Sequence, residues 1–214
     1  VISFGGDNHF QYVSGLVDSG LILGINSDSE LSEGALINSI SDYPALRGIL
    51  YSDKFKIEEW TRLKIRVNGR EIDRNVLCEI FIGEEQRTNM SRHILYHNDE
   101  KEEQKGSGLI VSTGAGSTGW YDSACRWLFP NGDTFARTAS EARYILTEPY
   151  KGKFSSYEML NGTLKSGELK ILSLSDSNSI LSLDCLENIP LKEGSEIKIR
   201  LGNPLRVVMP NIDS

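Results

Sequence analysis

Two glycine-rich segments, each leading into an expected helix, hold residues of types suited to phosphate chemistry. The first is Gly5-Gly6-Asp7-Asn8, which directly follows a short apolar run. Glycines after a buried strand let a ligand approach the backbone closely, and the free N–H groups at the start of a helix attract phosphate. Asp7 could accept a proton from a hydroxyl or bind a metal. The same residues would also form an ordinary strand-to-helix turn with Asp7 as the N-cap.

The second segment is Gly114-Ala-Gly-Ser-Thr118, which combines small residues with two hydroxyl groups before a helix. Such a segment suits a loop that cradles a nucleotide. It equally suits a capped helix start, in which the hydroxyl of Ser117 or Thr118 accepts a backbone hydrogen bond. Both interpretations stay open on these residues alone.

A single carboxylate, Glu79, interrupts the apolar run from Val76 to Ile82. A carboxylate that points into a protein interior needs a partner or a ligand, because burial of an unpaired charge is costly. Alternation along a strand could instead place Glu79 on the solvent side. His93 and His97 have the spacing of two metal ligands on a helix, but their neighbours favour a strand, where this spacing separates them. We therefore expect no metal site there.

Charge and composition limit the partners of the chain. Lys and Arg number 23 against 30 Asp and Glu, and the resulting net charge of −7 disfavours general binding of nucleic acid. Because no apolar run is long enough to cross a bilayer, we expect no membrane association and a cytoplasmic location. The three cysteines, Cys78, Cys125 and Cys185, form no Cys-x-x-Cys pair and are expected to be reduced thiols.

The elements expected around the first glycine segment form a βαβ unit. Apolar strands are predicted at Val1–Phe4 and Leu21–Ile25. A helix is predicted between them, with one apolar face formed by Phe10, Val13, Leu16 and Val17. This order predicts a parallel sheet, and since two strands cannot form a stable sheet alone, we expect further strands before Val1.

After about residue 45 the pattern changes to that of an antiparallel β domain. Arg62–Val67 alternates between polar and apolar residues and is followed by Asn68-Gly69, a strong hairpin signal. Further strands are predicted at 76–82, 168–174, 180–186 and 196–201. The charged stretch Asp99–Lys105 is expected to be a solvated hairpin tip.

One helix is predicted to interrupt this β-rich half, starting at Gly119. Its expected core face consists of Trp120, Ala124, Trp127 and Leu128, which share one side at helical spacing. The second glycine-rich segment therefore lies at the start of this helix.

Taken in order, these segments resemble motifs of the NAD kinase family. That family shows a Gly-Gly-Asp-Gly turn, a Gly-Ile-Asn-like segment, an Asn-Glu strand and a Gly-Ser-Thr loop that opens a helix. The corresponding residues here are Gly5–Asn8, Gly24–Asn26, Cys78-Glu79 and Gly116–Thr118. The narrower segments Asn26–Gly34, Glu79–Glu84, Gln104–Leu109 and Thr147–Tyr150 look like the mitochondrial-type branch.

The resemblance implies a fold of the α/β plus β class with two domains and an active site between them. Residues 1–45 would be the C-terminal part of an α/β nucleotide-binding domain, 46–200 a β-rich NAD-binding domain, and 201–214 a segment that could return to the first domain. The family resemblance also implies a homodimer or homotetramer.

The implied reaction transfers the γ-phosphate of ATP to the 2′-hydroxyl of the adenosine ribose of NAD. Asp7 would be the catalytic base, and Mg²⁺ or another divalent cation would accompany the triphosphate without a dedicated protein ligand. Glu79 would bind the nicotinamide-side ribose, and Thr118 and Gly119 would line the adenosine region. The full set of expected nucleotide contacts is Gly5, Gly6, Asn8, Asn26, Cys78, Glu79, Gly116, Ser117, Thr118, Gly119, Trp120 and Ser123.

Two departures from the family motifs leave an alternative open. Asn8 stands in place of a glycine, although Asn tolerates a left-handed backbone, and Cys78 stands in place of an Asn that hydrogen-bonds better than a thiol. Both favour a catalytically weak or idle NAD-sensing protein on the same fold. Lipid kinases share the Gly-Gly-Asp-Gly turn, but Glu79 favours a dinucleotide over a lipid.

Overall fold

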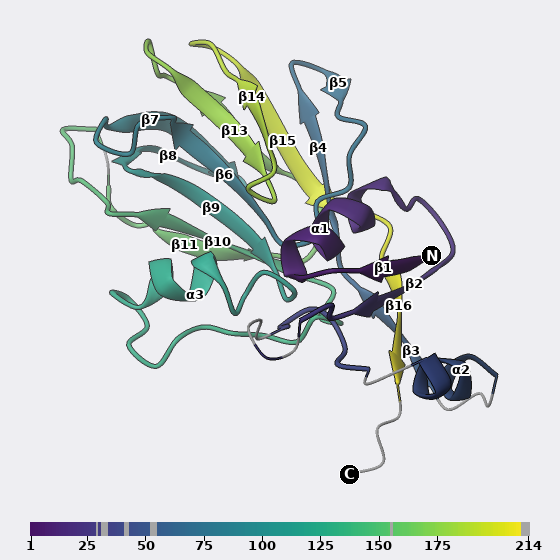
Figure 1. Ribbon diagram of the computed structural model, residues 1–214. Helices are drawn as coiled ribbons and strands as arrows, with labels where there is room; N and C mark the ends of the chain where they lie inside the picture. The colour runs from purple at the N-terminus through teal and green to yellow at the C-terminus, as the bar shows by residue number, and fades with distance from the viewer. Residues whose placement is uncertain (29, 31–33, 41–42, 52–54, 155, 211–214) are drawn as a thin grey trace.

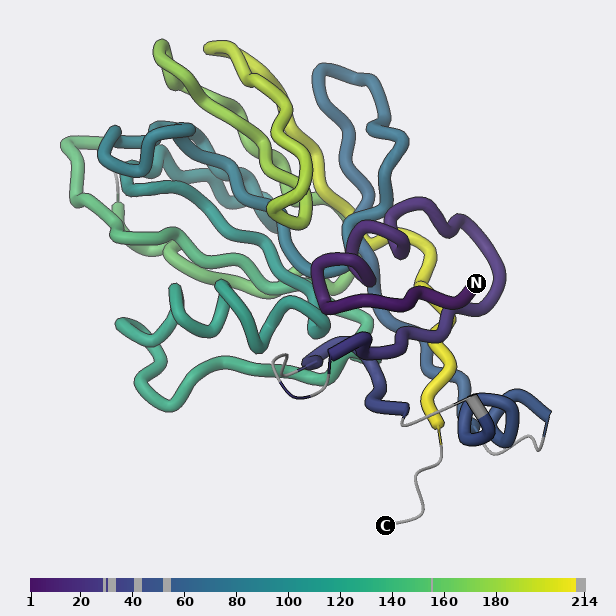
Figure 2. Tube along the Cα trace, viewed as in Figure 1, coloured from purple at the N-terminus to yellow at the C-terminus, as the bar shows by residue number. Residues whose placement is uncertain are grey.

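A four-stranded, mostly parallel sheet holds both ends of the chain. The computed structural model describes residues 1–28, 30, 34–40, 43–51, 55–154 and 156–210. In this part of the chain, β1 (Ile2–Phe4), α1 (Asp7–Leu16) and β2 (Leu21–Ile25) form the predicted βαβ unit, with β1 and β2 parallel. The sheet continues through β16 (Leu205–Pro210), which is parallel to β2, to β3 (Phe55–Trp60), which is antiparallel to β16 (Figures 1 and 2).

The pairing of β3 places it in this first sheet rather than in the β-rich half, and β16 brings the C-terminal part of the chain back beside β2. A short helix that the sequence patterns do not indicate, α2 (Tyr43–Tyr51), precedes β3. The domain boundaries at residues 45 and 200 stay a prediction.

Two six-stranded antiparallel sheets form the rest of the fold. One sheet has the strand order β5 (Arg70–Glu71), β4 (Leu63–Val67), β15 (Glu196–Leu201), β12 (Leu169–Ser173), β7 (Ser91–His97) and β8 (Glu100–Gly106). The other has the order β11 (Asn161–Leu164), β10 (Ala142–Thr147), β9 (Gly108–Thr113), β6 (Glu79–Glu84), β13 (Ser179–Leu183) and β14 (Glu187–Pro190). The Asn68-Gly69 hairpin is confirmed: both residues have positive φ, as a type I′ turn requires.

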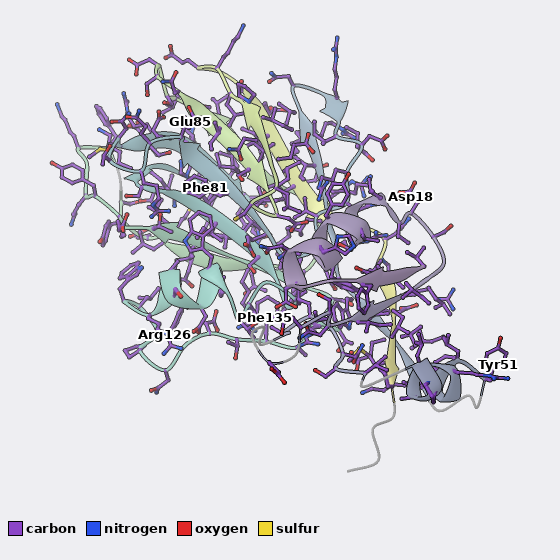
Figure 3. The ribbon with its side chains drawn as sticks, viewed as in Figure 1. Asp18, Tyr51, Phe81, Glu85, Arg126 and Phe135 are labelled. Atoms are coloured by element: carbon purple, nitrogen blue, oxygen red, sulfur yellow. The ribbon has the colours of Figure 1, made fainter. Side chains whose placement is uncertain are left out.

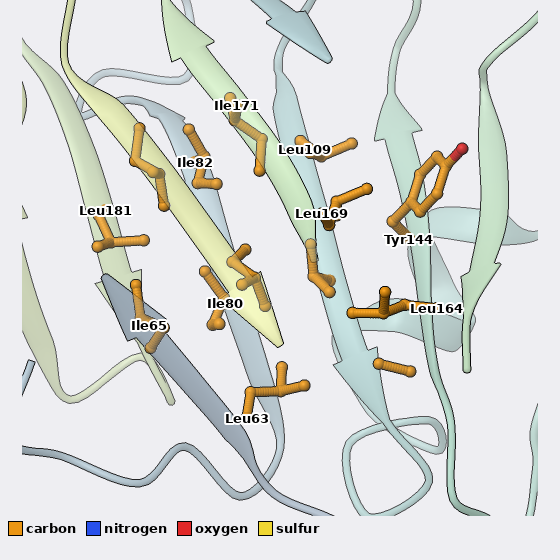
Figure 4. Close-up of a cluster of buried hydrophobic side chains, with 14 of the residues drawn as sticks. Leu63, Ile65, Ile80, Ile82, Leu109, Tyr144, Leu164, Leu169, Ile171 and Leu181 are labelled. Atoms are coloured by element: carbon orange, nitrogen blue, oxygen red, sulfur yellow. The ribbon is translucent and has the colours of Figure 1, made fainter. Parts of the chain in front are cut away.

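The main core lies between these two sheets (Figure 4). Alternating apolar residues of each strand point inward, for example Leu63 and Ile65 of β4, which are almost fully buried. They meet Ile80 and Ile82 of β6 in the same cluster. Burial of each such side chain contributes about 1.5–3 kcal/mol, so this core fixes the position of β6 firmly.

Helix α3 (Trp120–Cys125) covers the outer face of the second sheet, so the central strands β6 and β9 are buried on both faces. The predicted core face of this helix is confirmed only in part, because Trp120 and Ala124 pack against the buried cluster beside α3. Tyr121 and Cys125 are its buried residues, whereas Trp127 is 46% exposed. The reason is that α3 ends at Cys125, so helical spacing does not extend to Trp127.

The prediction for Asp99–Lys105 holds only for its start: Asp99 lies in the exposed turn of the β7–β8 hairpin, whereas residues 100–105 belong to strand β8. Two of its polar side chains are buried with partners. The Glu102 carboxylate accepts the N–H groups of Glu158 at 3.1 Å and Met159 at 2.6 Å. Gln104 bonds the ring of His93 at 2.9 Å, and His93 lies in strand β7 as predicted. Hydrogen-bond partners that are distant in sequence thus offset the cost of burying these two polar side chains. The charged composition of the stretch does not indicate that burial.

Candidate nucleotide site

Asp7 is the first residue of α1, and its carboxylate holds a distant backbone segment. Gly6 is the N-cap and no side chain caps the helix, so Asp7 is not the N-cap. Instead, Asp7 Oδ2 accepts the N–H of Ala35 and Oδ1 accepts the N–H of Leu36, each at 2.9 Å. The candidate base therefore has a fixed orientation at the positive end of a helix.

The other residues of this turn are ordered by close contacts. A Cβ on Gly5 would lie 2.8 Å from the Cβ of His9, so glycine is needed there. Asn8 lies inside α1 with a right-handed backbone, so the left-handed conformation considered for it is not required. Its side chain is exposed.

Asn26 follows β2 directly and is almost fully buried. Its Oδ1 accepts the N–H of Asp28 at 3.1 Å, and its backbone N–H bonds the carbonyl of Asn38 at 2.9 Å. Since β1 and β2 are parallel, Asn26 and the Gly5-Gly6 turn both lie at the carboxyl ends of neighbouring strands. Ligands of open α/β sheets bind at this edge.

Cys78 and Glu79 are buried at the start of β6, and Asp184 fixes their backbone. The carboxylate of Asp184 accepts the N–H groups of Leu77 at 3.0 Å, Cys78 at 2.7 Å and Glu79 at 3.2 Å. In return, the Asp184 N–H donates to the Glu79 carbonyl at 2.9 Å. Asp184 was not predicted as a site residue, although it interrupts the apolar run from Ile180 to Leu186 as Glu79 interrupts that from Val76 to Ile82.

Glu79 does not lie on the solvent side, because only 8% of it is exposed. Burial, and then the negative charge of Asp184, raises the pKa of Glu79 to about 7. The thiol of Cys185 lies 3.6 Å from Glu79 Oε1 and opposes this shift as a hydrogen-bond donor. Burial and the Glu79 carboxylate raise the pKa of Cys185 to about 12. Near neutral pH, Glu79 can therefore donate or accept a hydrogen bond.

The second glycine-rich segment packs directly on this pair. A Cβ on Gly116 would lie 2.5 Å from the Cys78 carbonyl oxygen and 2.7 Å from Glu79 Oε2. Only glycine permits this approach. The structure thus brings the Gly116 loop and the Cys78-Glu79 strand together, as the resemblance implies.

Ser117 supports the loop from within. Its hydroxyl is fully buried, donates to the Gly114 carbonyl at 2.9 Å and accepts the Phe135 N–H at 3.1 Å. It is not the N-cap of α3, and neither is Thr118, because Gly119 holds that position without a side-chain cap. Thr118 and Gly119 are exposed. The structure therefore gives Ser117 a role in loop shape and leaves Thr118 and Gly119 on the accessible side.

The opening turn meets these two segments through the start of α1. Phe10 shares one buried apolar cluster with Cys78 and Ala115. The side chain of Gln11 hydrogen-bonds the Cys78 thiol, whose pKa is raised by burial first and also by the charges of Asp184, Glu79 and Asp7. Segments near residues 7, 78 and 116 therefore lie close together, and the Cys78 side chain is buried between them.

Trp120 and Ser123 line a neighbouring pocket of 680 Å³ whose walls include neither the opening turn nor Gly116. Phe81 lies on β6, two residues after Glu79 (Figure 3). The centroid of its ring lies 5.1 Å from that of Trp120. Arg87 lies over both rings, at 5.3 Å and 5.6 Å, and pairs with Glu148 at 3.2 Å. Such an aromatic pocket with one cation suits a planar, polar ring.

The described residues contain neither a cluster of metal-ligating side chains nor a membrane-spanning helix. Within the described residues, no group of three or more His, Cys, Asp or Glu side chains is arranged to hold a metal ion. The helices in this part of the chain are all too short or too polar to cross a membrane.

A four-stranded, mostly parallel sheet joined to two antiparallel sheets matches the NAD kinase-like fold class. An NAD kinase from Archaeoglobus fulgidus, solved with ATP, superposes on 99% of this chain with a TM-score of 0.75 at 18% identity. Yeast NADH kinase, solved with NADH, superposes on 97% with a TM-score of 0.74 at 17% identity. This chain spans 77% and 60% of the lengths of those two proteins. By sequence, no family model and no curated protein matches it.

Proposed function

We propose that this protein is an ATP-dependent NAD kinase that phosphorylates the 2′-hydroxyl of the adenosine ribose of NAD to give NADP. The observation that carries the proposal is the contact of Gly116 with the Cys78 carbonyl and the Glu79 carboxylate, in a region that packs against Phe10 of the helix that carries Asp7. Three motifs far apart in sequence thus share one site. The fold of proteins solved with ATP and with NADH supports the same reaction class.

Asp7 would act as the base. Its two carboxylate oxygens each accept one backbone N–H, and each retains a further lone pair for the ribose hydroxyl. As the 2′-oxygen forms its bond to the γ-phosphorus, the proton passes to Asp7 and the bond to the β-phosphate oxygen breaks, releasing ADP. Positioning by the fixed carboxylate and the positive helix end would supply most of the rate.

Glu79 would bind a ribose hydroxyl of NAD, since its raised pKa lets it act as donor or acceptor near neutral pH. Thr118 and Gly119 are accessible beside Gly116 and would line the adenosine region. Trp120 and Ser123 would extend the contact surface into the aromatic pocket. Gly5 and Gly6 precede the helix start and would leave room for phosphate.

The donor residues present fit a magnesium ion that arrives with its nucleotide. Among the described residues no preformed cage exists, and Mg²⁺ in phosphoryl-transfer sites usually keeps several waters and binds few carboxylates besides substrate phosphates. Such an ion would neutralise charge on the triphosphate. Among the described site residues, the Asp7 carboxylate could approach such an ion.

An NAD-sensing protein without turnover is the second candidate. One observation favours it: both Asp7 oxygens already accept hydrogen bonds from backbone amides, so the carboxylate also serves a structural purpose.

The resemblance further supports a cytoplasmic homodimer or homotetramer of the mitochondrial-type branch. Light scattering would measure the oligomeric state.

An assay of NADP formation separates these candidates. The protein is incubated with Mg²⁺, with ATP or polyphosphate, and with NAD or NADH, while NAD binding is measured by calorimetry. Donor-dependent formation of NADP supports the kinase. Tight binding of NAD without NADP formation supports the sensor, and absence of both results contradicts each candidate.

A further inference from the structure

Arg137 reaches from the loop after α3 to the segment that holds Asp7. Its guanidinium Nη2 donates to the carbonyl of Ala35, a residue 102 positions earlier in the chain. The N–H groups of Ala35 and Leu36 in turn donate to the Asp7 carboxylate. One short backbone segment is thus held on its carbonyl side by Arg137 and on its amide side by Asp7.

The guanidinium of Arg137 is itself fixed from several sides. It lies over the ring of Trp60, 4.8 Å from the centroid, and Trp60 is fully buried. The Trp60 indole donates to Glu58 at 2.9 Å. Burial alone would raise the pKa of Glu58, but the hydrogen bonds from Lys56 and Trp60 lower it, with a smaller contribution from the charge of Arg137. The Arg137 carbonyl accepts the N–H of Thr61 at 3.2 Å. A planar cation stacked and bonded in this way is preorganised.

The same loop supports the second glycine-rich segment. A Cβ on Gly114 would collide with the Ala136 carbonyl and would lie 2.8 Å from the Arg137 Cα. Residues 136 and 137 therefore contact Gly114 through their backbone, while the Arg137 side chain reaches the segment that orients Asp7. Arg137 is the connection between the two glycine-rich motifs.

We infer that Arg137 is a positioning residue that sets the Asp7 carboxylate relative to the Gly114–Thr118 loop. This inference rests on the proposed kinase function for its kinetic consequence. Among the described residues, the Arg137 guanidinium bonds the Ala35 carbonyl and lies over the Trp60 ring, neither of which is assigned to the reaction. It acts by fixing the Ala35 carbonyl, and so the two amides that aim Asp7.

Kinetics of Arg137→Ala and Arg137→Lys test the inference. Misplacement of a base by about 1 Å can lower a rate about 100-fold, so we expect kcat of Arg137→Ala to fall about 10- to 100-fold with little change in KM for NAD. Lysine keeps the charge but not the planar, stacked guanidinium, so Arg137→Lys should not restore the rate. Restoration by lysine, or loss confined to KM, would overturn the positioning role.

Amide hydrogen exchange provides a readout that does not depend on turnover. The Ala35 and Leu36 amides should exchange at least several-fold faster in both Arg137 variants than in the wild type. Arg92→Ala is a matched control, because Arg92 is about half-exposed and pairs with Glu103 on the far sheet. Unchanged exchange at Ala35 and Leu36 would overturn the inference even if wild-type turnover is absent. Absence of wild-type turnover with faster exchange would contradict only the proposed function.

Discussion

The Asp184 carboxylate accepts the backbone N–H of Cys78 at 2.7 Å, although 106 residues separate them in sequence. The same carboxylate also binds the N–H groups of Leu77 and Glu79. One buried side chain thus sets the backbone on which Glu79 stands. Its own pKa is raised by burial, against the lowering effect of these three N–H donors.

Asp184→Asn should destabilise the protein. The amide group would turn an N–H₂ toward backbone N–H donors, and a buried unsatisfied donor costs about 1–3 kcal/mol. Urea unfolding measures the change, with Asp176→Asn as control because Asp176 is exposed. Equal unfolding midpoints for the two variants would show that the three amides do not depend on the carboxylate.

Asp7→Asn should abolish turnover and leave NAD affinity largely unchanged. An amide cannot take the ribose proton, but its oxygen can still accept one of the two N–H groups at residues 35 and 36. Steady-state rates and calorimetric binding of NAD are compared in the same preparation. A variant with near-normal rate would mean that another group serves as base.

Glu79 should make stability depend on pH. Its pKa is about 7 in the folded protein against the ordinary glutamate value of 4.5, so the folded state binds more protons than the unfolded state between these pH values. The stabilisation present below pH 4.5 is therefore lost as pH rises through about 7, by an amount that could reach about 3 kcal/mol.

Glu79→Gln removes this titration, so its free energy of unfolding should fall less than that of the wild type between pH 5 and pH 8. Urea unfolding at pH 5, 6.5 and 8 measures both, with the exposed Glu187 as control in Glu187→Gln. Parallel pH profiles for wild type and Glu79→Gln would contradict the raised pKa.

Gly116→Ala should destabilise the protein and weaken NAD binding together. The new methyl group would lie 2.5 Å from the Cys78 carbonyl oxygen, so either β6 or the loop must move. Overpacking of this kind typically costs about 1–3 kcal/mol. Thermal unfolding and NAD titration are the measurements.

Gly48→Ala is the matched control for that change. Gly48 lies in α2, and a Cβ there would meet open space, so alanine should be neutral or slightly stabilising. If both alanine variants melt at the wild-type temperature, the close contact at Gly116 is not a constraint in solution.

Local patterns were sufficient to predict the βαβ unit, the Asn68-Gly69 hairpin and several alternating strands, because each depends on neighbours in sequence. The resemblance indicated which segments would meet, and Gly116 does contact Glu79. Assignment of the individual nucleotide contacts stays a prediction.

The features that sequence patterns missed depend on contacts across the fold. The charged sequence around Glu102 suggests a surface residue, but its carboxylate accepts the backbone N–H groups of Glu158 and Met159. The role of Asp184 depends on its hydrogen bond with the backbone of Cys78, which is distant in sequence. The role of Ser117 likewise depends on its hydrogen bond with the backbone of Phe135. Trp127 was predicted to be a core residue but is exposed, because α3 ends at Cys125 and no residue pattern in the sequence marks this early end.

The position of β16 has a consequence for how the protein is made. This strand lies between β2 and β3. The sheet next to α1, the helix that begins at Asp7, therefore cannot be completed until residues 205–210 have left the ribosome. Such pairings have high contact order, which slows folding. During synthesis, β2 must therefore keep an open strand edge until β16 follows β15 out of the ribosome, and a premature stop codon before residue 205 would leave that edge free to aggregate.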